Sequence, residues 1–68
     1  MSMKFKKGDL LTCMAMVVKI PVARVERVTR DGVVHCVNLV ESQTMKAGWK
    51  FQIGQHDETT RYELYSDE

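Results

Sequence analysis

The stretch VARVERVTRDGVVHCVNLV, residues 22–40, decides the fold of this 68-residue chain. In Val22–Thr29, β-branched residues alternate with charged ones, which is typical of a half-buried strand. The Asp31-Gly32 dipeptide that follows predicts a hairpin turn, because these residues readily adopt the positive φ angles of tight hairpins. Val33–Val40 is the strongest strand signal in the chain. The stretch therefore predicts an antiparallel β-hairpin.

Shorter strands are predicted downstream of the hairpin. Trp49–Ile53 alternates between apolar and polar residues, which places Trp49 with the core, and Arg61–Tyr65 forms a last strand. Glu41–Gly48 forms a loop. Four to five short antiparallel strands separated by turns predict a mostly β protein, a small barrel whose closure removes exposed sheet edges.

Residues 10–20 leave two structures open, because the run is apolar with little periodicity. In one, a short helix begins with Asp9 as its N-cap and ends at Pro21. In the other, the run is a strand buried on both sides. Met14 and Met16 are expected in the core.

The length of the chain allows a single small domain, residues 1–68. A chain of this size buries only about 60% of its unfolded surface, so its stability is expected to be marginal. Residues 1–7 are expected to form a flexible basic arm and residues 66–68 a flexible tail.

The two cysteines, Cys13 and Cys36, lie within apolar runs. Disulfide scaffolds of small secreted domains usually have four or more cysteines. We therefore expect two free thiols in a reducing cytoplasm. The apolar run is also too short to span a bilayer, and no membrane association is expected.

Charge is divided unevenly along the chain. Residues 1–30 carry seven basic and two acidic side chains, and residues 31–68 carry three basic and seven acidic ones, which leaves a net charge of +1. Either the fold presents a basic face and an acidic face, or the two halves interleave and neutralise each other.

The residue pattern also resembles a known family. Phe5-x-x-Gly8-Asp9-x-Leu11, Val25-x-x-Val28 and Asp31-Gly32-Val33-Val34-x-Cys36 are similar to segments of small bacterial SH3-like barrel proteins of the YodC-like type, and to KOW and Tudor-type barrels. The similarity covers roughly residues 4–40. It implies an SH3-like barrel, and the KOW type implies binding to RNA or to the transcription and translation machinery. The Ser-Gly-Gly-Pro-like loop expected after the first strand is replaced here by Met14–Ile20.

Catalytic and metal-binding patterns are absent from the sequence. Cys13, His35, Cys36 and His56 do not have the paired spacing of zinc ligands. Neighbouring residues of a strand point to opposite faces, so His35 and Cys36 are not expected to act together. We expect neither an enzyme nor a cofactor.

Binding is the remaining class of function. We expect another protein as the partner, with the chain acting as a regulatory module such as a phage or bacterial modulator of a host protein, or a homodimer. The alternative is RNA or single-stranded DNA held on a basic face with stacking aromatics. The candidate residues for either partner are Lys4, Lys6, Lys7, Arg24, Arg27, Arg30, Trp49 and Tyr62.

Overall fold

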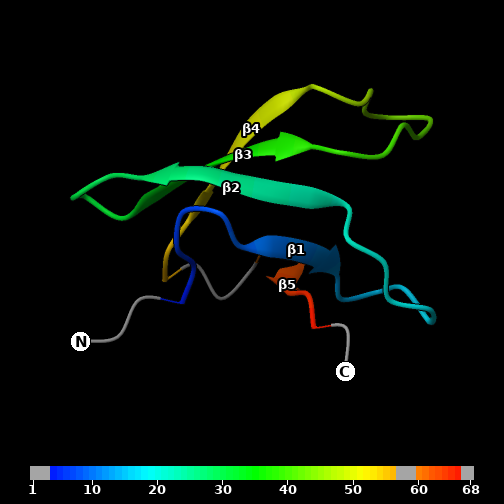
Figure 1. The fold of residues 1–68 in the computed structure, drawn as a ribbon, viewed down its shortest axis with the longest axis horizontal. Coiled ribbons are helices and arrows are strands. Elements are labelled where there is room, and N and C mark those ends of the chain that lie inside the picture. Colours follow the sequence, from blue (N-terminus) through cyan, green and yellow to red (C-terminus); the bar gives the residue numbers. More distant parts are fainter. Residues whose placement is uncertain (1–3, 57–59, 67–68) are drawn as a thin grey trace.

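The computed structural model describes residues 4–56 and 60–66, and these form one curled, antiparallel five-stranded sheet (Figure 1). The strands are β1 (Leu10–Cys13), β2 (Ala23–Val28), β3 (Val33–Asn38), β4 (Lys50–Gly54) and β5 (Tyr62–Leu64). Their order across the sheet is β4-β3-β2-β1-β5. The rings of Phe51 and Tyr62, on the two edge strands, stack with centroids 5.1 Å apart, so the sheet curls into a half-barrel. The prediction of a mostly β protein with five antiparallel strands is confirmed.

The predicted hairpin is formed by β2 and β3. The Thr29 N–H donates to the Val33 carbonyl at 2.9 Å, and the Thr29 hydroxyl accepts from the Val33 N–H at 3.0 Å. Gly32 completes the turn with a φ of +88°, which an L-residue adopts only at a cost. A β-bulge interrupts the register between Val25 and Arg27.

Residues 10–20 form a short strand followed by an irregular loop, so the helix alternative is wrong. Asp9 does not cap a helix, because its carboxylate accepts from the Lys6 N–H at 2.8 Å and closes the preceding turn. The Met16 N–H then bonds the Cys13 carbonyl at 3.2 Å and turns the chain out of β1. Within the described residues, no helix is long and apolar enough to cross a bilayer.

The core lies inside the curl of the sheet. Its buried members are Phe5, Leu11, Ala23, Val25, Val34 and Cys36. Phe5 is fully buried although residues 1–7 were expected to be a flexible arm. The Phe5 side chain therefore anchors this part of the expected arm in the core. Residues 67–68 of the expected tail lie outside the described part of the chain.

Gln55 fixes the N-terminal segment to the sheet. Its side-chain oxygen accepts from the Phe5 N–H at 2.6 Å, and its side-chain nitrogen donates to the Phe5 carbonyl at 2.8 Å. Its backbone N–H donates to the Gly32 carbonyl at 2.7 Å. The Gln55 side chain is only 2% exposed, so these polar groups are satisfied away from water.

Trp49 departs from the predicted core. The strand begins one residue later, at Lys50, and the Trp49 side chain is 57% exposed. Phe51 and Ile53 do pack against the core, as their alternation predicts. Met14, which was also expected in the core, is 54% exposed.

Replacing Gln55 tests the connection between the N-terminal segment and the sheet. Gln55→Ala is expected to lower the free energy of unfolding by about 2–3 kcal/mol, since it leaves buried backbone groups of Phe5 without partners. Urea unfolding followed by circular dichroism measures this. The exposed Gln52→Ala variant is the control, with an expected change within about 0.5 kcal/mol. Equal losses in the two variants would contradict the prediction.

Candidate functional site

An apolar groove lies between the β1–β2 loop, residues 14–22, and the β3–β4 loop, residues 39–49. Both loops leave the same end of the sheet (Figure 1), and the Leu39 N–H bonds the Val22 carbonyl at 2.8 Å. The groove has a volume of about 320 Å³. Its lining consists of Cys13, Met16, Ile20, Val22, Asn38, Val40, Ser42, Thr44, Met45 and Tyr62.

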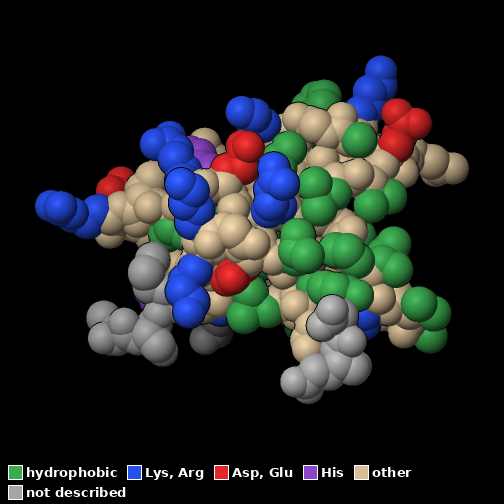
Figure 2. Space-filling model, viewed as in Figure 1, with side chains coloured by type: hydrophobic (Ala, Val, Ile, Leu, Met, Phe, Trp, Pro, Cys, Tyr) green, Lys and Arg blue, Asp and Glu red, His purple; other side chains and the backbone are tan. Residues whose placement is uncertain are grey.

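Large hydrophobic side chains are exposed around this groove. Among the described residues, nine such side chains are exposed, and seven of them belong to the two loops: Met14, Val17, Val18, Ile20, Leu39, Val40 and Trp49. Val17 is 98% exposed and Val18 is 72% exposed. Figure 2 shows hydrophobic side chains gathered on one part of the molecule, beside a separate group of Lys and Arg side chains. A concentration of this kind is typical of a contact surface.

Lys19 shapes the β1–β2 loop from within. Its ammonium group donates to the carbonyls of Cys13 at 3.1 Å and Met14 at 2.9 Å. The same group lies 3.1 Å from the Glu63 carboxylate on β5. The loop is therefore held by polar contacts to its own backbone and to β5, and Val17 and Val18 are left at its surface.

Asn38 plays the corresponding part in the β3–β4 loop. Its side-chain nitrogen donates to the carbonyls of Val40 at 2.6 Å and Lys46 at 3.0 Å, and the side chain is buried. Ser42 closes the middle of the loop by accepting from the Met45 N–H at 3.1 Å. This loop too is fixed through its backbone.

Each loop turns one methionine inward. Met16 is the partly buried residue among residues 14–20, and Met45 is the partly buried residue among residues 39–49. Both side chains line the groove together with Cys13. Methionine is flexible and polarisable, so such a lining adapts to ligands of different shape.

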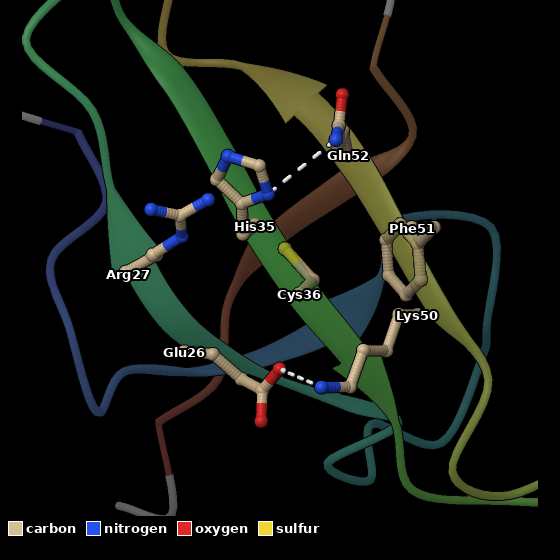
Figure 3. Close-up of a pocket in the computed structure, with 7 residues that line it drawn as sticks. All are labelled: Glu26, Arg27, His35, Cys36, Lys50, Phe51 and Gln52. Carbon is tan, nitrogen blue, oxygen red and sulfur yellow. Dashed lines mark hydrogen bonds and ion pairs between the residues drawn. The ribbon is translucent and has the colours of Figure 1, made fainter.

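A second, polar depression of about 580 Å³ lies on the sheet of β2, β3 and β4 (Figure 3). Glu26 of β2 reaches across β3 to Lys50 of β4, with the carboxylate and the ammonium 3.5 Å apart. The His35 ring lies 3.4 Å from the Gln52 amide nitrogen. Arg27 points into the same region and has no carboxylate within salt-bridge distance among the described residues.

The structure places the predicted site residues in several different regions of the surface. Lys7 and Arg24 line a shallow depression beside Glu26, and Arg27 lies near them on β2. Arg30 lies on the hairpin turn, and Lys4 and Lys6 are exposed in the N-terminal segment. Tyr62 lines the apolar groove, and its stacking on Phe51 leaves that face unavailable to a ligand.

Burial affects the titration of Cys36 and Tyr62. Burial raises the pKa of the Cys36 thiol to about 11, and the negative charge of Glu26 adds to this. Burial also raises the pKa of Tyr62, with smaller contributions from Cys13 and Cys36. A thiol with a raised pKa is a weak nucleophile at neutral pH, since the thiolate is the reactive form.

His35 and Cys36 lie on opposite faces of β3, in agreement with strand geometry. Cys36 is buried in the core, whereas His35 is half-buried on the other face. Within the described residues, no three His, Cys, Asp or Glu side chains are grouped so that they could hold a metal ion.

Sequence reasoning missed Asn38, Gln55 and the exposure of residues 14–20. Asn38 and Gln55 are polar residues that read as strand and loop members, and only their burial reveals their roles. The apolar run carried a usable signal in Lys19, since one charge interrupts it just before Pro21.

Comparisons of the chain with protein-family models, with curated proteins and with solved structures find no match.

The two thiols provide a test of the groove geometry. Ellman's reagent at neutral pH is expected to modify Cys13 rapidly, because this thiol is partly exposed in the groove, and Cys36 slowly. A pKa of about 11 in place of 9.0 reduces the thiolate fraction of Cys36 about a hundredfold. A Cys13→Ser variant should show the slow phase alone. A fast phase that persists in this variant would contradict the assignment.

Proposed function

We propose that the chain is a small, non-enzymatic protein-binding module that holds an apolar segment of another protein in the groove between its two loops. The observation that carries this proposal is the exposure of seven large hydrophobic side chains on those loops. A protein that did not use them would gain stability by burying them, at about 25 cal/mol for each Å² removed from water.

The way the loops are held supports the same function. Lys19 and Asn38 fix the loop backbones through hydrogen bonds to carbonyl groups, so the apolar side chains are not needed to hold the loops in place. A loop that is already ordered loses less conformational entropy when a partner binds. The methionine lining allows the groove to fit its ligand closely.

The strand order supports a finer assignment of the fold, which we propose to be an SH3-like barrel. An antiparallel meander from β1 to β4, with β5 pairing back onto β1, is compatible with that architecture. Barrels of this kind carry binding surfaces on their loops. On this basis the chain acts as a regulatory module, such as a phage or bacterial modulator of a host protein.

Polar substitution of the groove tests the proposal. Ile20→Ser and Val40→Ser each change a side chain that is 40% exposed and lines the groove, so the fold should tolerate them. Capture of a stoichiometric partner from nuclease-treated lysate of the source cells, measured by affinity pull-down, is expected to fall at least about tenfold, as for a loss of 1.4 kcal/mol in binding.

Conservative variants separate loss of binding from loss of structure. Ile20→Leu and Val40→Ile keep the groove apolar and should retain the partner. If neither Ile20→Ser nor Val40→Ser reduces capture of the partner, the partner binds outside the groove. The absence of any stoichiometric partner would contradict the proposed function.

A second candidate function is binding of RNA or single-stranded DNA. The observation in its favour is the group of exposed cations on and beside β2, where Arg24 and Arg27 form no salt bridge with a described carboxylate. Unpaired cations on one face can neutralise phosphates and release counterions.

Salt dependence tests this second function. If Arg24 and Arg27 each contact a phosphate, the double variant Arg24→Glu/Arg27→Glu should reduce the slope of log K against log salt by about 1.4 for a single strand. Fluorescence anisotropy with a labelled 20-nucleotide oligouridylate, repeated over a range of salt concentrations, measures the slope of log K against log salt. Lys46→Glu, in the β3–β4 loop, is the control for charge reversal. No binding at low salt would eliminate this function.

A further inference from the structure

The surface beside the groove alternates apolar and cationic side chains in one row across the sheet. Leu10 of β1 pairs with Arg24 of β2, Arg24 pairs with Val37 of β3, and Val37 pairs with Lys50 of β4. Paired residues of adjacent strands point to the same face. Leu10 is 37% exposed, and the Lys50 side chain is 75% exposed. A ligand that crosses the four strands here would contact apolar and cationic side chains in alternation, in the order Leu10, Arg24, Val37 and Lys50.

Two residues of the row are close in sequence to residues that line the apolar groove. Val22, which lines the groove, precedes Arg24 by two residues, and Val40 follows Val37 by three. Two residues of extended backbone span about 7 Å, so a peptide of a few residues is long enough to extend from Val22 to Arg24. Figure 2 shows the hydrophobic and basic side chains side by side on the same face of the molecule.

Positive charge exceeds negative charge on this face. Lys7, Arg24, Arg27 and Lys50 lie around the carboxylate of Glu26, which is the acidic residue lining both depressions beside β2. Glu26 is engaged with Lys50 at 3.5 Å. The guanidinium groups of Arg24 and Arg27 remain available to an anionic ligand among the described residues.

The apolar members of the row favour a protein ligand over a nucleic acid. Bases of a single strand bind by stacking on flat aromatic side chains. Here the apolar members of the row are the aliphatic Leu10 and Val37, the rings of Phe51 and Tyr62 stack on each other, and the exposed Trp49 lies in the β3–β4 loop outside the row. Aliphatic side chains interleaved with cations match a peptide that interleaves apolar residues with carboxylates.

We infer that the partner segment is an acidic amphipathic peptide, whose apolar side chains enter the groove and whose carboxylates pair with Arg24 and Arg27. This inference rests on the proposed function and adds the chemistry of the partner. Arg forms bidentate contacts with carboxylates, so these pairs also set the direction of the bound peptide.

A random 12-residue peptide library displayed on phage and selected on the full-length protein tests the inference. Enriched sequences are expected to combine apolar residues with Asp or Glu. Synthetic copies of them should bind about tenfold more weakly to Arg24→Glu/Arg27→Glu, because two attractive charges become repulsive. Lys46→Glu, a charge reversal outside the row and the groove, should leave their binding within about twofold.

The outcomes separate the inference from the proposed function. Enriched peptides that are neutral or basic, and that lose binding in Ile20→Ser, would overturn the acidic partner and leave the groove as the site. Displacement of the acidic peptides by a 20-residue oligouridylate that binds more tightly than they do would also overturn the inference, in favour of nucleic acid. A selection without enriched sequences would contradict the proposed function together with the inference.

Discussion

The contact on which the rest of the structure depends is the pair of hydrogen bonds between the Gln55 side chain and the backbone of Phe5. It joins residues 50 positions apart and brings the Phe5 ring into the centre of the half-barrel. The described core has six buried members, and Phe5 is the largest of them. Gln55 also bonds the hairpin turn through Gly32, so one residue connects the N-terminal segment, the β2–β3 hairpin and the end of β4. In a chain too short for a large core, a fully satisfied buried amide gives the sheet a defined closure.

At the opposite end of the sheet, the β1–β2 and β3–β4 loops are held by polar contacts to their backbone and not by burial of their apolar side chains. Lys19 and Asn38 hold the two loops through backbone carbonyls, and the loops keep their apolar side chains outside. Burying Val17 and Val18 would contribute about 1.5–3 kcal/mol for each side chain, a large amount for a small domain. Their exposure therefore has a stability cost, and the ordered backbone beneath them makes a surface ready for contact. The end of the sheet that Gln55 joins to Phe5 stabilises the fold. The opposite end, which carries the β1–β2 and β3–β4 loops, presents the apolar groove.

The sequence predicted the parts of the fold whose signals are local. The Asp31-Gly32 turn and the flanking strands follow from φ preferences and from an alternation of period two, which act within a few residues. The exposure of residues 14–20 was not predictable in this way. Hydrophobic residues are usually buried, and the sequence does not indicate that these remain exposed. The role of Gln55 was equally hidden, since its partner lies at the far end of the sequence. Of the candidate residues, Lys7 and Arg24 line one depression and Arg27 lines a neighbouring one that shares Glu26, whereas Tyr62 lines the apolar groove.

The ion pairs determine which cations near the apolar groove are left without a described carboxylate partner. Lys19 of the basic first half pairs with Glu63 of the acidic second half. The other pair, Lys50 with Glu26, joins a cation of the second half to a carboxylate of the first half. Both pairs are partly exposed, so they contribute little to stability. Their effect is on the distribution of charge: they engage cations at the groove edge and at β4, and the guanidinium groups of β2 remain without a described carboxylate partner. Two cations of β2, Arg24 and Arg27, therefore remain without a salt bridge to a described carboxylate. In the proposed function, a ligand with both apolar side chains and carboxylates would cover the exposed apolar surface and neutralise the charge of Arg24 and Arg27.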